Sequence, residues 1–143
     1  MATPLRLHHV GFVVASIEQA MPGFLRSLAA RWDVKVFHDP LQKVKVAFLT
    51  TRAEDPQIEL VEPAGEDSPV LRFLEQGGGL HHVCYEVADL EQQLTEFRSR
   101  GAVIAKRPKP AVAFGGRRIA WVITAEKLLV ELLEETMKDE QGP

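Results

Sequence analysis

The residues of this 143-residue chain that could do chemistry are two histidine pairs and two glutamates, which recur at nearly constant spacing. They are His8-His9, His81-His82, Glu59 and Glu131. Each glutamate stands between two apolar residues, where a carboxylate is costly to bury unless it is paired or binds a metal. Neutral imidazole and carboxylate together suit Zn, Co, Ni, Mn or Fe(II). The residue types therefore indicate a metal site.

The recurrence of these residues belongs to an internal repeat. LHHVGFVVASIEQ at residues 7–19 matches LHHVCYEVADLEQ at residues 80–92 in eight of 13 positions, at an offset of 73. VAFL at 46–49 then matches IAWV at 119–122 at the same offset, and IEL at 58–60 matches VEL at 130–132 at an offset of 72. Three blocks in one order predict two copies of one structural unit.

Alternation along a strand decides which histidine of each pair faces inward. Successive side chains in a strand point to opposite faces, so only one histidine of each pair can face a common interior. We take His9 and His82 as inward-facing and expect His8 and His81 to be structural, solvent-facing or interface residues. If each unit curves into half a cup, pseudo-symmetry brings four metal ligands together: His9, Glu59, His82 and Glu131.

Each copy reads as a βαβββ unit, which predicts an α+β fold. The expected strands cover 9–14, 33–37, 43–51 and 57–62 in the first copy and 82–87, 103–106, 117–124 and 128–134 in the second. Helix starts are expected at Ser16 and Asp89, which have the spacing of a capping box. A short linker helix is expected after Ser68, a cap residue that precedes proline, with glycines 77–79 ending it. The polar tail 135–143 is expected to fray.

The predicted organisation is a single domain over residues 1–143. Module one covers about 5–62, a linker with its helix about 63–79, and module two about 80–135. Such a length is ordinary for one domain.

Composition and charge exclude several classes of protein. The net charge of −3 provides no basic face for nucleic acid. No apolar run approaches the roughly 20 residues that a membrane helix needs, and the first residues show no secretory signal. The single cysteine, Cys84, cannot form an internal disulfide and is expected to pack as a small hydrophobe. These features favour a cytoplasmic protein that binds neither nucleic acid nor membrane.

Several motifs resemble the vicinal-oxygen-chelate superfamily of glyoxalase I, extradiol dioxygenases and antibiotic-resistance proteins. Within it, the methylmalonyl-CoA epimerases are the most similar, through IELVEP at 58–63, GEDSP at 65–69, GLHHVCYEV at 79–87 and GGRR at 115–118. The resemblance spans about residues 7–134. It implies two βαβββ modules that form one eight-stranded, cup-like sheet around a divalent metal ion (Co, Ni, Zn or Mn). It also implies an acyl-CoA thioester substrate and a homodimer.

The resemblance also implies a mechanism, with two departures from the family pattern, a serious one at Val46 and a further one at Ile123-Thr124. His9, Glu59, His82 and Glu131 fall on the family's metal positions, where the second ligand is glutamine or glutamate. Glu131 would also be the base, with a raised pKa, that removes the proton alpha to the thioester carbonyl and so forms an enolate. Some epimerases carry a second catalytic glutamate at the position of Val46. Its neighbour Lys45 should point the other way.

Two other functions remain open at this point. A glyoxalase I-like lactoylglutathione lyase is the first alternative, because bacterial forms use the same His, Glu, His, Glu set. A non-catalytic protein that binds a small ligand in the same fold is the second. Extradiol dioxygenases, which use two histidines and one glutamate on Fe(II), fit the four-residue set less well.

Overall fold

The computed structural model describes residues 5–135, so the tail beyond 135 that was expected to fray lies outside the described residues. The first half of the chain contains β1 (Arg6–Val13), α1 (Ile17–Leu28), β2 (Arg31–Trp32), β3 (Phe37–Asp39), β4 (Val44–Thr50) and β5 (Gln57–Pro63). The linker contains α2 (Leu71–Glu75). The second half contains β6 (Gly79–Val87), α3 (Leu90–Ser99), β7 (Val103–Pro110), a short 3-10 helix (Val112–Phe114), β8 (Arg118–Ile123) and β9 (Leu129–Glu134).

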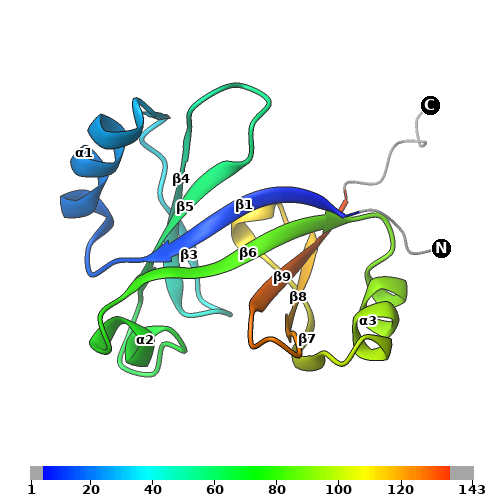
Figure 1. Cartoon of the computed structure of the whole chain (residues 1–143). Coiled ribbons are helices and arrows are strands. Elements are labelled where there is room, and N and C mark those ends of the chain that lie inside the picture. Colours follow the sequence, from blue (N-terminus) through cyan, green and yellow to red (C-terminus); the bar gives the residue numbers. More distant parts are fainter. Residues whose placement is uncertain (1–4, 136–143) are drawn as a thin grey trace.

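All strands of residues 5–135 belong to one mixed sheet in the order β2-β4-β5-β1-β6-β9-β8-β7, with β3 also paired to β4. β1 and β6 are antiparallel neighbours at its centre, and each runs parallel to the last strand of its own half, β5 or β9. Figure 1 shows these two strands side by side across the middle of the molecule, with one half of the sheet on either side. The predicted α+β fold built on a repeated unit is confirmed.

One expected strand is wrong. Residues 33–37 were predicted as a strand, but the chain forms two short strands, β2 and β3, and residues 33–36 join them. Val34 has φ of 65°, a left-handed conformation that a strand cannot contain. The sheet therefore has nine strands instead of the expected eight.

The two long helices cover the outer face of the sheet, one on each half (Figure 1). Ile17 and Met21 of α1 pack against β4 and β5, and α3 packs in the same way against β8 and β9. The predicted helix starts are confirmed: Ser16 Oγ accepts from the backbone N–H of Gln19 at 3.1 Å, and the Asp89 carboxylate caps α3 equivalently. These helices leave the opposite face of the sheet free to build a site.

The linker helix forms, but its predicted cap is wrong. α2 begins at Leu71, and the Ser68 hydroxyl has no hydrogen-bond partner among the described residues. The Ser68 carbonyl instead accepts from the Leu71 N–H at 3.2 Å. At the far end, Gly78 adopts φ of 67°, and a Cβ there would lie 2.9 Å from the Val13 carbonyl oxygen. Glycine therefore lets the linker pass close to β1 as it enters β6.

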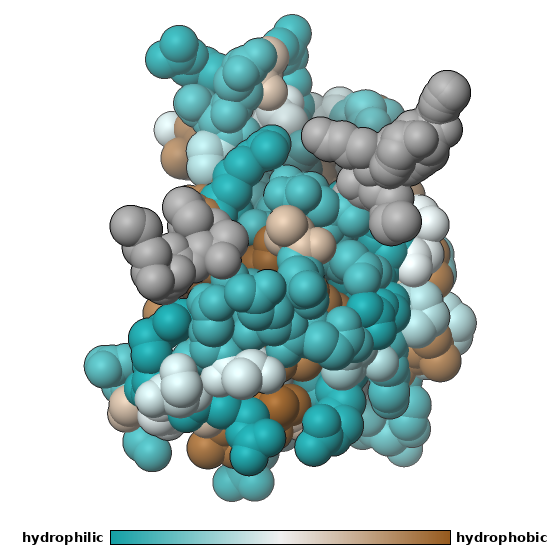
Figure 2. Space-filling view, turned by 90° about the vertical axis from the view of Figure 1, so that its right-hand side faces the viewer, coloured by the Kyte–Doolittle hydropathy of each residue, from teal (hydrophilic) through white to brown (hydrophobic). Residues whose placement is uncertain are grey.

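One face of the molecule carries mainly polar side chains. Figure 2 shows a face dominated by hydrophilic residues with scattered hydrophobic ones between them. No helix within residues 5–135 is long and apolar enough to cross a membrane.

Candidate metal centre

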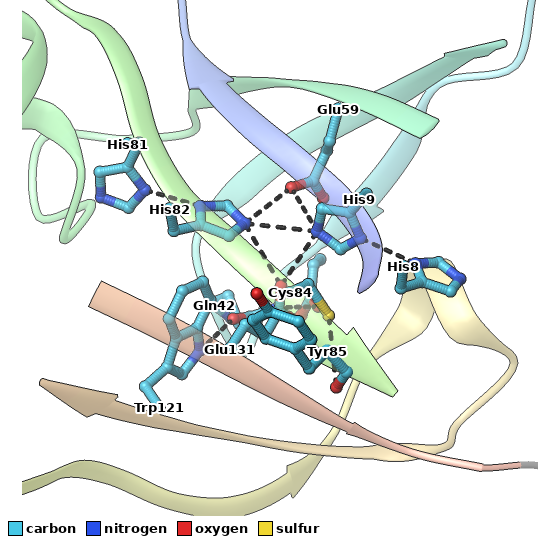
Figure 3. Close-up of polar contacts among 11 residues, drawn as sticks. His8, His9, Gln42, Glu59, His81, His82, Cys84, Tyr85, Trp121 and Glu131 are labelled. Atoms are coloured by element: carbon cyan, nitrogen blue, oxygen red, sulfur yellow. Dashed lines mark hydrogen bonds and ion pairs between the residues drawn. The ribbon is translucent and has the colours of Figure 1, made fainter. Parts of the chain in front are cut away.

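Four buried side chains converge where the two halves of the sheet meet. His9 comes from β1, Glu59 from β5, His82 from β6 and Glu131 from β9. All four are buried, with 0–5% of their surface exposed. Each carboxylate Oε1 lies 3.1–3.3 Å from both Nε2 atoms, and the two Nε2 atoms lie 3.3 Å apart (Figure 3). The structure thus brings together all four predicted residues, here called the His–Glu quartet.

The quartet fits a divalent ion better than it fits a hydrogen-bonded cluster. The Oε1 atoms of Glu59 and Glu131 are buried and have no well-formed hydrogen bond within the described part of the chain. All four donor atoms lie within 4.8 Å of one another, an arrangement that could hold one metal ion. Bonds of about 2.0–2.2 Å to one ion would place neighbouring donors roughly 2.8–3.6 Å apart. The separation of the two Nε2 atoms and the four separations between Nε2 and Oε1 atoms fall in this range.

Electrostatics keep both carboxylates charged. Burial would raise the pKa of Glu59 and Glu131, but the imidazoles of His9 and His82 outweigh it and hold both pKa values below their usual range. Conversely, burial would lower the pKa of the two histidines, but the carboxylates raise it above its usual value. We expected a raised pKa for Glu131. In the presence of these four groups alone its pKa is lowered, so that expectation is wrong. Charged carboxylates are the form that binds a cation.

The quartet opens onto a cavity of about 160 Å³. Both halves of the sheet line this cavity, so the sheet curls until its halves face each other across the site. Its polar lining, besides Glu59, His82 and Glu131, consists of Asp39, Gln42, His81, Lys106 and Trp121.

Val46 also lines this cavity, where it offers no proton-carrying group. As predicted, Lys45 lies on the other face of β4, where its Nζ is 3.7 Å from Glu62. Asp39 is buried, but it accepts hydrogen bonds from two backbone N–H groups of its own turn and from that of Val112. Neither Lys45 of β4 nor Asp39 of β3 therefore takes the place of a glutamate at position 46.

Comparison with known proteins agrees with this geometry. Residues 8–121 match the Glyoxalase/Bleomycin resistance protein/Dioxygenase superfamily. The chain belongs to this superfamily. Within it, the ethylmalonyl-CoA/methylmalonyl-CoA epimerase of Cereibacter sphaeroides is 32% identical over 119 residues, which cover 82% of this chain and 87% of that protein. An uncharacterised protein of Bacillus subtilis is 35% identical over 132 residues, or 90% and 91% of the two chains.

A solved superfamily member shares the whole fold. The crystal structure of methylmalonyl-CoA epimerase from Mycobacterium tuberculosis matches with a TM-score of 0.82 and 28% identity, over 96% of this chain and 94% of that one. The predicted resemblance to this superfamily and to its epimerases is confirmed.

The first histidine of each pair, His8 or His81, lies differently from what strict alternation along a strand predicts. His8 and His81 do not point away from the ligands: their Nδ1 atoms lie 2.8 and 2.9 Å from the Nδ1 atoms of His9 and His82 (Figure 3). The register between β1 and β6 skips one residue at His8 and another at His81, so each is the extra residue of a β-bulge. A bulge interrupts strict alternation, which explains the wrong expectation.

Burial sets the charge of these two outer histidines. Burial and the neighbouring imidazole of His82 lower the pKa of His81 to about 4. The pKa of His8 is lowered for the same two reasons, burial first and then the neighbouring His9. Both rings are therefore neutral at neutral pH and able to accept a hydrogen bond.

Gly11 is a further site residue that sequence reasoning missed. It lies directly opposite His82 in the β1–β6 pair, and a Cβ there would be 2.2 Å from His82 Cε1 and 2.7 Å from both ring nitrogens. The His82 ring also packs edge-on against Trp121 at 4.8 Å between centroids, which limits its freedom to move. The absence of a side chain at Gly11 therefore makes the space that the ligand ring occupies.

Gly11→Ala is expected to weaken metal binding by about 10- to 100-fold, the usual cost of disturbing a ligand's support. The matched control is Gly23→Ala in α1, where a Cβ meets nothing within 4 Å. Competition of both variants with a metal chelator measures the effect. Equal affinity of Gly11→Ala and the wild type would show that the His82 ring does not need this space.

Proposed function

We propose that the protein is a metal-dependent epimerase that acts on an acyl-CoA thioester of the methylmalonyl-CoA type. One observation carries the proposal: two histidines and two glutamates, all buried, converge beside a cavity in a chain whose relatives include a named epimerase of this substrate. The quartet would hold one divalent ion, with Co, Ni, Zn and Mn as candidates.

The reaction that this geometry favours is proton transfer at the carbon between the thioester and the carboxylate. A divalent ion on the thioester oxygen would stabilise the negative charge that develops there as the proton leaves. Glu131 lines the cavity and is the group that we assign as the base. Apolar residues of the cavity, Val44, Val46 and Val61 among them, would limit the access of bulk water to the reacting carbon.

Inversion also requires a proton to reach the opposite face of that carbon. Because Val46 cannot carry it, we propose that water admitted to the cavity delivers this proton. The rate of inversion relative to the rate of proton exchange then depends on how readily this water enters.

A glyoxalase-type lyase is the second candidate, because it uses the same four ligand types. The two functions are separated by assaying cobalt-loaded protein with one stereoisomer of methylmalonyl-CoA and with the hemithioacetal of methylglyoxal and glutathione. The proposal predicts turnover of the CoA thioester alone. Turnover of the hemithioacetal alone would replace the epimerase assignment with the lyase.

The cytoplasmic location and the homodimer remain predictions. β2 and β7 are the edge strands of the sheet, and Val103 at the start of β7 is 64% exposed. Pro108 and Pro110 lie later in β7, where they have no backbone N–H to donate and so disfavour pairing with a further strand. The open part of this edge, around Val103, is where we expect two copies to meet.

A further inference from the structure

The outer histidines, His8 and His81, have no part in the mechanism above, yet the structure places them identically. Each is the extra residue of a bulge, one in β1 and the other in β6. Each ring stands edge-on to the ligand ring beside it, with 5.1 Å between centroids in both pairs. The same arrangement in two halves of the sheet points to one shared task.

The direction of the hydrogen bond in each pair follows from the quartet. His9 and His82 turn their Nε2 atoms to the common point, where a ligand needs a lone pair. When an ion takes the place of the Nε2 proton, the imidazole is neutral and carries its one remaining hydrogen on Nδ1. The ligand Nδ1–H therefore donates, and the Nδ1 of His8 or His81 accepts at 2.8 or 2.9 Å. The hydrogen of each outer ring is left on its Nε2.

We propose that His8 and His81 are positioning residues of the metal centre, which fix the tautomer and the ring orientation of His9 and His82. The inference rests on the proposed metal site. Metal-bound histidines are commonly held in this way by an acceptor on the other ring nitrogen, most often a carboxylate or a carbonyl. Here a second imidazole takes that place, and a bulge brings it within reach.

Packing holds the two acceptors in position. The His81 ring contacts Phe73 of α2, with centroids 4.8 Å apart, and the His8 ring contacts Phe114 of the 3-10 helix at 5.4 Å. Each acceptor is thus placed by a segment outside the four ligand strands. Linker and loop packing therefore set the orientation of the metal ligands.

The two outer histidines differ in what they face. His81 lines the 160 Å³ cavity beside the quartet. His8 lines a separate cavity of about 550 Å³, and Phe114 borders both. Substitution of His8 therefore tests the positioning role without altering a residue that lines the cavity proposed for the acyl group.

The test compares cobalt binding of His81→Leu, His81→Asn and His8→Leu with that of the wild type. Leucine removes the acceptor at similar size, whereas asparagine places an amide oxygen near the original Nδ1. His38→Leu, at an exposed histidine of β3, is the matched control. Chelator competition gives the dissociation constant, and the visible spectrum of bound Co(II) reports the ligand geometry. Circular dichroism confirms that each variant is folded.

We expect each leucine variant at an outer histidine to bind cobalt about 10- to 100-fold more weakly with an altered spectrum. His81→Asn should return to within a few-fold of the wild type, and His38→Leu should equal it. Wild-type affinity and spectrum in a folded His81→Leu or His8→Leu protein would overturn the inference, as would His81→Asn binding as weakly as His81→Leu. Failure of the wild type itself to bind cobalt would overturn the metal centre, and the positioning role with it.

Discussion

Cobalt-loaded Glu131→Gln is expected to lose about 10²- to 10⁴-fold in epimerisation rate while it retains the ion. The loss is the usual contribution of a positioned general base, and an amide cannot accept the proton. The amide oxygen of glutamine can still act as a ligand, so binding should weaken much less than catalysis. A chiral assay of methylmalonyl-CoA measures the rate, and metal analysis of the same sample measures occupancy.

The matched control for this substitution is Glu59→Gln. In geometry the two glutamates are nearly equivalent, since each Oε1 lies 3.1–3.3 Å from both Nε2 atoms. If Glu131 alone is the base, Glu59→Gln should keep most of its activity. Equal losses in the two variants would mean that Glu131 has no role as base that Glu59 lacks, and an active Glu131→Gln would reject the role of base.

His82→Ala is expected to abolish stoichiometric metal binding. The ring is buried and would supply one of the four protein donors of the proposed centre, and its loss leaves two charged carboxylates without a full set of partners. After loading and dialysis, elemental analysis should give about one ion per chain for the wild type and almost none for the variant. His38→Ala, at an exposed histidine, should bind like the wild type. Full occupancy in His82→Ala would remove this residue from the centre.

The quartet could be predicted because its four residues occupy equivalent positions in the two copies of the internal repeat. His9 and His82 stand at equivalent positions of two copies, as do Glu59 and Glu131, so the central pairing of β1 with β6 brings all four together. A single histidine in a strand would have supported no such conclusion. The helix starts were predictable for a simpler reason, because Ser16 and Asp89 act on backbone groups only three residues away.

The residues that position the quartet, His8, His81 and Gly11, were not predictable, because their roles depend on contacts across strands. The bulges at His8 and His81 appear only in the register between β1 and β6, so strict alternation assigned both side chains to the wrong side. The repetition of the whole histidine pair in both copies was the one available signal. Gly11 matters because of the ring opposite it, which no local pattern shows. Likewise, the strand expected over residues 33–37 does not form because a single residue, Val34, adopts a left-handed backbone conformation.

Methylmalonyl-CoA of one configuration, incubated in D2O with cobalt-loaded protein, tests the central claim most directly. NMR follows deuterium entry at the carbon alpha to the thioester, and a chiral assay follows configuration. Deuterium entry accompanied by racemisation is the predicted result, and it would show that Val46 does not prevent inversion. Deuterium entry with retained configuration would show a one-base site whose reaction is not epimerisation. Absence of any exchange would contradict proton abstraction at this centre altogether.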